Sequence, residues 1–63
     1  MTEKTKIVIA DDHPLFRAGL RQVIDAERLF DVVGEASDGE TALQMICELR
    51  PDTVILDINM PLL

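Results

Sequence analysis

The chain of 63 residues is long enough for one domain at most, and 48% of it is hydrophobic against 29% charged, which indicates a globular protein rather than a disordered one. Twelve acidic residues oppose six basic ones, so the formal net charge of -6 argues against a segment that grips a nucleic-acid backbone by itself. A single cysteine, Cys47, excludes an internal disulfide and suits the reducing cytoplasm, where we expect the protein to be. We expect no membrane span and no signal peptide, because no apolar run approaches ~20 residues.

The first predicted element is a strand from Lys6 to Ala10. Its middle is continuously apolar and β-branched (IVI), which is typical of a strand buried on both faces of a parallel sheet. Asp11 and Asp12 follow this strand directly. Two like charges so close together repel each other, so the pair needs a physical reason to be there.

An amphipathic helix is predicted from Pro14 onward. Pro14 suits the first helical turn, and Asp12 or His13 is the candidate cap. Leu15 falls off the apolar stripe of this helix and is predicted to be exposed. The residues with the spacing of an inward stripe are Phe16, Gly19, Leu20, Val23 and Ile24.

A polar link from Ala26 to Arg28 leads to a second predicted strand that begins near Val32 and ends near Ala36. The stretch "SDGETALQMICELRP" then predicts a helix, with Ser37 or Asp38 as its cap and Pro51 preventing its continuation. Cys47 lies near the inward stripe and is predicted to be a small core or boundary residue. The stripe itself consists of Ala42, Leu43, Ile46 and Leu49.

A third apolar strand is predicted over Thr53 to Leu56, and it ends on Asp57. The order is therefore β-α-β-α-β, for which right-handed crossovers predict an α/β fold with a parallel sheet. Ligands of open α/β sheets lie at the carboxyl ends of the strands. If the strands take the flavodoxin-like order 2-1-3, Asp11, Asp12 and Asp57 converge on one crevice.

Three crowded carboxylates would raise one another's pKa values unless a cation lies between them. Magnesium is the natural choice, because it takes oxygen ligands and often meets a phosphate. Asp57 is then placed to be a nucleophile, since aspartyl phosphates are an established covalent intermediate. The simpler alternatives are a solvated strand end with one helix cap for Asp11 and Asp12, and the start of a turn for Asp57.

The motifs "KIVIADDHPLFRAGL", "VVGEASDGETAL" and "PDTVILDINMP" resemble the receiver domain of bacterial two-component response regulators, and "ADDHPLFRAGL" is similar to the NarL/FixJ subfamily. The resemblance covers essentially residues 1–63, in family order and spacing. A receiver has about five β-α units, and these residues supply two and a half. We therefore interpret them as the N-terminal half of a receiver domain, with a truncated flavodoxin-like fold.

The resemblance implies that Asp57 accepts a phosphoryl group from the phosphohistidine of a histidine kinase, as an acceptor rather than an enzyme. It also implies that Mg²⁺ is bound directly by Asp12, Asp57 and the backbone carbonyl of Asn59, while Asp11 acts mainly through bound water. Leu15 lies on the helix that docks against the kinase in this family. DNA would be bound only through an output domain, to which none of these residues belongs.

Two other functions stay open. A phosphohydrolase of the haloacid dehalogenase type also places its nucleophile after an apolar strand, and "VILDIN" is similar to its Asp-x-Asp motif. That family has a second Asp where this chain has Asn59, and its nucleophile strand comes first. The remaining alternative is an interaction module that works without phosphorylation.

Self-association is a further expectation. In the order 2-1-3 the third strand is normally internal, so a chain that stops after it exposes an unpaired apolar edge. We expect third strands to pair across a two-fold axis.

Overall fold

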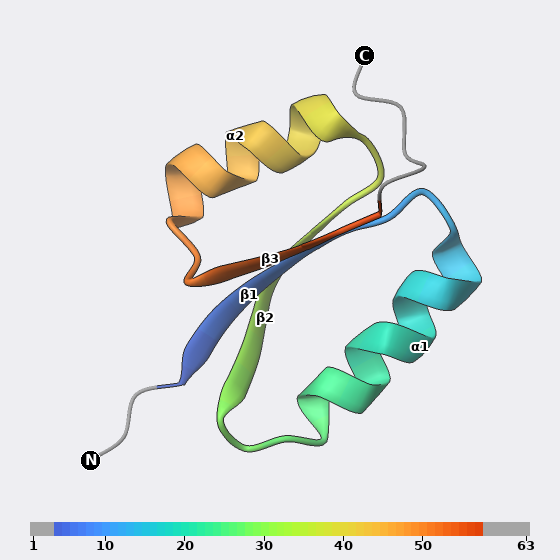
Figure 1. Ribbon diagram of the computed structural model, residues 1–63, viewed down its shortest axis with the longest axis vertical. Helices are drawn as coiled ribbons and strands as arrows, with labels where there is room; N and C mark the ends of the chain where they lie inside the picture. The colour runs from blue at the N-terminus through green and yellow to red at the C-terminus, as the bar shows by residue number, and fades with distance from the viewer. Residues whose placement is uncertain (1–3, 58–63) are drawn as a thin grey trace.

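The computed structural model describes residues 4–57, and their elements follow the predicted order β-α-β-α-β (Figure 1). None of the helices in this range is long and apolar enough to cross a membrane. The elements are β1 (Thr5–Ala10), α1 (Pro14–Asp25), β2 (Phe30–Ala36), α2 (Gly39–Leu49) and β3 (Thr53–Leu56).

The three strands form one parallel sheet in the order β2-β1-β3, which confirms the predicted order 2-1-3. The register between β1 and β2 shifts once, because Ile7 pairs with Val32 whereas Val8 pairs with Gly34. Ala10, the last residue of β1, pairs with the last residue of each neighbouring strand. All three strands therefore end level, and the loops that follow them leave from one edge of the sheet.

The two helices cover opposite faces of the sheet (Figure 1). A glycine lets α2 approach closely, because a Cβ atom on Gly34 would lie 3.0 Å from the Met45 sulfur and 3.1 Å from a Leu49 methyl carbon. The core on the α1 side contains Ile7, Ile9, Leu20, Ile24, Val32 and Ile55. The core on the α2 side contains Ala10, Ala36, Ala42 and Met45.

The helix ends agree with the predicted signals in part. Asp38 caps α2, because the backbone N–H of Thr41 donates to its carboxylate at 2.7 Å, and this bond is the main reason that the pKa of Asp38 is lowered. His13 occupies the cap position of α1, but its side chain makes no capping hydrogen bond. Arg50 ends α2 in the left-handed region with φ of 48°, a conformation that favours glycine.

The inward stripe predicted for α1 is only half correct. Leu20 and Ile24 pack against the sheet, whereas Phe16 and Val23 are 63% and 69% exposed. Leu15 is exposed as predicted. The periodicity identifies a broad apolar face, but a sheet of three strands is wide enough to cover only part of it.

The stripe of α2 shows the same departure. Ala42 and Met45 pack on the sheet, but Leu43 and Leu49 are exposed. Cys47 is exposed as well, so its predicted place in the core or at its boundary is wrong. Met45 and one methyl group of Leu49 lie close to Gly34 of β2, so the sheet covers one edge of the apolar stripe and leaves Leu43 exposed among residues 4–57.

Candidate functional site

The backbone brings the ends of all three strands together at one edge of the sheet. The N–H of Asp57 donates to the carbonyl of Ala10 at 2.9 Å, and the N–H of Asp11 donates to the carbonyl of Ala36 at 2.9 Å. Both bonds are made one residue beyond the strands. The loops after β1 and β3 therefore leave the sheet side by side, each with an acidic residue at its start.

The carboxylates predicted to converge do lie together. One oxygen each of Asp11, Asp12 and Asp57, with one ring nitrogen of His13, all lie within 4.8 Å of one another. The Asp11 and Asp57 side chains are 5% and 16% exposed, while Asp12 is 36% exposed, so the cluster has a buried base and an open rim. Asn59, the other predicted metal ligand, lies outside the described residues.

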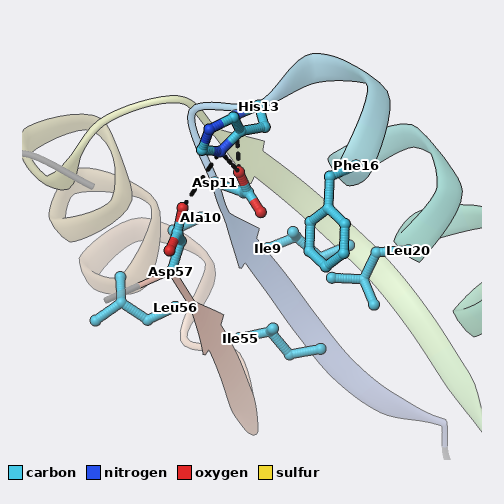
Figure 2. Close-up of a pocket in the computed structure, with 9 residues that line it drawn as sticks. All are labelled: Ile9, Ala10, Asp11, His13, Phe16, Leu20, Ile55, Leu56 and Asp57. Carbon is cyan, nitrogen blue, oxygen red and sulfur yellow. Dashed lines mark hydrogen bonds and ion pairs between the residues drawn. The ribbon is translucent and has the colours of Figure 1, made fainter. Parts of the chain in front are cut away.

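His13 lies at the centre of this cluster, although the sequence pattern predicted only a helix cap at this position. Its Nδ1 atom is 2.9 Å from a carboxylate oxygen of Asp12, 3.2 Å from one of Asp11 and 3.5 Å from one of Asp57. Figure 2 shows the ring lying above Asp11 and Asp57. The hydrogen bond to Asp11, followed by the charge of Asp12, raises the pKa of His13. The imidazole therefore takes a place where positive charge is stabilised.

Arg17 fastens the loop after β1 to the end of β2. One guanidinium nitrogen donates to the backbone carbonyls of Asp11 at 2.8 Å and of Ala36 at 3.4 Å. Its Nε lies 3.2 Å from a carboxylate oxygen of Glu35, which also pairs with Arg21. Arg17 thus holds the backbone from which the acidic side chains project.

An open crevice of about 260 Å³ lies beside the cluster (Figure 2). Asp11, His13 and Asp57 form its polar end, and the rest of its lining is apolar. This wall lowers the local dielectric, which strengthens the attraction between the carboxylates and any cation that they hold. The apolar lining consists of Ile9, Ala10, Phe16, Leu20, Ile55 and Leu56.

The donor set fits a hard divalent cation. Three carboxylates from two adjacent loops offer oxygen ligands at one point, which is the preference of Mg²⁺. The ring nitrogen of His13 lies within 3.5 Å of all three carboxylates, at a position where a positive charge would be stabilised. Chemically, such a site can bind a cation and present the Asp57 carboxylate to an electrophile that enters the crevice.

Sequence reasoning missed His13 and Arg17. The letters "DDH" at the end of a strand gave a signal for His13, but only the ring orientation shows that it turns back over the carboxylates. Arg17 acts on backbone carbonyls 6 and 19 residues away in the chain. No local pattern marks such contacts.

Comparison with known proteins gives a consistent result. The model of the response regulator receiver domain matches residues 7–63. The chain is 45% identical over 58 residues to the transcriptional regulatory protein DegU of Brevibacillus brevis, covering 92% of this chain and 25% of that protein. The chain thus spans about a quarter of the length of this relative.

Solved structures agree with the sequence relatives. The signal receiver domain of the putative response regulator NarL from Mycobacterium tuberculosis superimposes with a TM-score of 0.91 at 46% identity, covering 94% of this chain and 48% of that one. RcsB from Salmonella enterica serovar Typhimurium, bound to promoter rprA in the presence of the phosphomimetic BeF3-, gives a TM-score of 0.87 at 30% identity, covering 94% of this chain and 29% of that one.

Proposed function

Because this chain belongs to the response regulator receiver domain family, we propose that it is the phosphoacceptor part of a two-component response regulator, with Asp57 as the acceptor. The observation that carries the proposal is the meeting of Asp57 with Asp11 and Asp12 at the carboxyl edge of a 2-1-3 sheet. RcsB, a relative at 30% identity, was solved with a phosphoryl mimic, which supports phosphoryl chemistry in this family. Residues 1–63 are proposed to be the N-terminal half of the receiver.

The transfer needs little more than placement and charge. A carboxylate oxygen of Asp57 attacks the phosphorus of a phosphohistidine, the P–N bond breaks, and its electron pair stays with the departing imidazole. The product is an aspartyl phosphate. The chain's own contribution is to hold Asp57 in the lining of the open crevice, where its side chain is 16% exposed.

We propose that Asp12, Asp57 and the backbone carbonyl of Asn59 hold Mg²⁺, and that Asp11 acts through bound water. The bound cation would supply positive charge to the phosphoryl oxygens. Asp11 suits an indirect role, because its Oδ1 already accepts the backbone N–H of His13 at 2.7 Å and its side chain is only 5% exposed.

Arg17 gives the first prediction. Arg17→Gln should weaken Mg²⁺ binding about tenfold, because it frees the Asp11 carbonyl from the end of β2, and partners behind metal ligands typically contribute 10–100-fold to affinity. Isothermal titration calorimetry measures the change. Simple electrostatics predicts the opposite sign, since the substitution removes a positive charge. Arg28→Gln, an equal charge change in the exposed link before β2, should leave binding unchanged or slightly stronger. Unchanged or tighter binding in Arg17→Gln would contradict the positioning role.

The proposed function is tested by incubating the chain with acetyl phosphate and Mg²⁺ and measuring its intact mass. One added phosphoryl group supports an acceptor. Continuous release of phosphate from a general substrate would support the phosphohydrolase alternative. If neither result is observed, the interaction module is the supported alternative. We propose an acceptor without turnover of its own.

The expected partners, a histidine kinase and DNA, are inferred from the family and are predictions for this chain. We propose that a histidine kinase docks on α1, where Leu15 is 90% exposed. DNA would be reached only through an output domain outside these residues; among the relatives, RcsB was solved bound to a promoter. We expect a cytoplasmic location.

Self-association through β3 gives the second prediction. In the described part of the chain β3 pairs only with β1, and the exposed side chains of Leu43, on α2, and Leu56, the last residue of β3, line one apolar hollow. Pairing of two β3 strands across a two-fold axis would satisfy the free edge and cover this apolar surface. Sedimentation velocity at micromolar concentrations should therefore show dimers.

A lysine on the strand provides the control. Thr53→Lys places a charge on an exposed position of β3 and should shift the population to monomers, whereas Gln22→Lys on the exposed side of α1 should not. A well-folded monomer in the unsubstituted chain would contradict pairing through β3.

A further inference from the structure

The position of His13 in the candidate metal site suggests a role beyond that of a neighbouring loop residue. It is the only histidine of the chain, and its Nδ1 faces three carboxylates that belong to two different loops. Its backbone N–H donates to Oδ1 of Asp11 at 2.7 Å and its ring Nδ1 lies 3.2 Å from the same oxygen, so both the backbone and the ring contact this buried carboxylate. The side chain is 67% exposed, which leaves the same cluster open to ions from solvent.

The spacing of the donor atoms matches that of ligands around one ion. With metal–ligand distances of about 2.1 Å, two donors on one metal lie about 3.0 Å apart at a right angle and about 3.4 Å apart at a tetrahedral angle. The distances from Nδ1 to the oxygens of Asp12, Asp11 and Asp57 are 2.9, 3.2 and 3.5 Å. A cation entering among these oxygens therefore meets a nitrogen donor at ligand distance with little movement of the ring.

We propose that His13 is itself a ligand of the divalent cation through Nδ1, which adds an imidazole to the carboxylates of Asp12 and Asp57 and gives a site that prefers first-row transition ions to Mg²⁺. The inference rests on the proposed function, because it uses the same carboxylates. The chemical basis of this proposal is that Mg²⁺ prefers oxygen ligands such as carboxylates, whereas an imidazole ligand increases the affinity most for Ni²⁺, Cu²⁺ and Zn²⁺. His13 therefore determines which ion the site selects, rather than whether it binds one.

The test compares two metals in a chain that carries Cys47→Ser, because the exposed thiol of Cys47 is a competing soft ligand. Calorimetry with Ni²⁺ and with Mg²⁺ is done on this parent and on its His13→Ala and His13→Asn derivatives. We expect the affinity for Ni²⁺ to fall at least tenfold in both derivatives, while that for Mg²⁺ changes less than threefold. Circular dichroism verifies that each derivative keeps the parent's fold.

A second measurement needs no substitution at position 13. Because the chain has one histidine, long-range ¹H–¹⁵N spectra report its two ring nitrogens without overlap. On addition of Zn²⁺ to the Cys47→Ser parent, the Nδ1 resonance should move to the position of a metal-bound nitrogen while Nε2 keeps its proton. An unmoved Nδ1 resonance in the presence of bound Zn²⁺ would overturn the proposal.

The remaining outcomes separate this inference from the proposed function. Equal loss of both metals in the His13 derivatives would mean a structural role, and equal gain would mean that the ring competes with the ion; either overturns the proposal. If the parent binds Mg²⁺ and accepts a phosphoryl group but shows no selectivity, only this inference fails. If the parent binds neither metal, the metal site of the proposed function fails as well.

Discussion

Asp57→Asn should abolish the mass increase that acetyl phosphate and Mg²⁺ produce in the unsubstituted chain. An amide matches the carboxylate in size, so the loop after β3 and its backbone bond to Ala10 should persist. The amide oxygen lacks the negative charge that makes the carboxylate a nucleophile, and it is a poorer ligand for a hard cation. Intact-mass spectrometry over a time course measures the effect, and we expect complete loss rather than slowing.

The matched control is Asp31→Asn. It makes the same chemical change in an exposed residue near the start of β2, at the opposite end of the sheet from the site. This variant should be phosphorylated as fast as the unsubstituted chain. If Asp57→Asn gains a phosphoryl group as readily as the control, the acceptor is another side chain.

Ile9→Ala should destabilise the chain strongly. Ile9 is fully buried on the α1 side of the central strand, in the cluster formed with Ile7, Ile24 and Val32. Truncating a buried isoleucine to alanine costs about 2–5 kcal/mol. At about 0.05–0.15 kcal/mol per residue, a chain of this length has a free energy of unfolding of only roughly 3–9 kcal/mol. One such cavity therefore removes a large share of it.

Urea titration followed by far-ultraviolet circular dichroism measures this loss, at one protein concentration because association would add to the apparent stability. Val23→Ala is the control, since that side chain is 69% exposed and its truncation should change the free energy of unfolding by less than about 0.5 kcal/mol. A loss below about 1 kcal/mol in Ile9→Ala would show that the core does not close around β1.

The sequence pattern was sufficient for the strands, because the runs from Ile7 to Ile9 and from Val54 to Leu56 are apolar and are separated by helical patterns. The order 2-1-3 came from the resemblance to the receiver family, and the structure confirms it. The extent of the core was harder to predict. A helical repeat marks Phe16 and Leu20 alike, and only the width of the sheet decides that Leu20 packs on it while Phe16 is exposed. Periodicity identifies which face is apolar without identifying what covers it.

The candidate site divides in the same way. The meeting of Asp11 and Asp57 was predictable, because it depends on strand direction and order alone. The roles of His13 and Arg17 depend on side-chain rotation and on contacts with backbone carbonyls across the fold. Neither the rotation of a side chain nor a contact with a distant carbonyl produces a repeat or spacing that can be recognised in the sequence.

The main-chain bonds from Asp57 to Ala10 and from Asp11 to Ala36 have an evolutionary consequence. Because peptide groups make these bonds, the frame of the pocket does not depend on which side chains stand at the strand ends. Mutation can therefore exchange those side chains one at a time, and so vary ion preference or reactivity, without dismantling the scaffold that presents them.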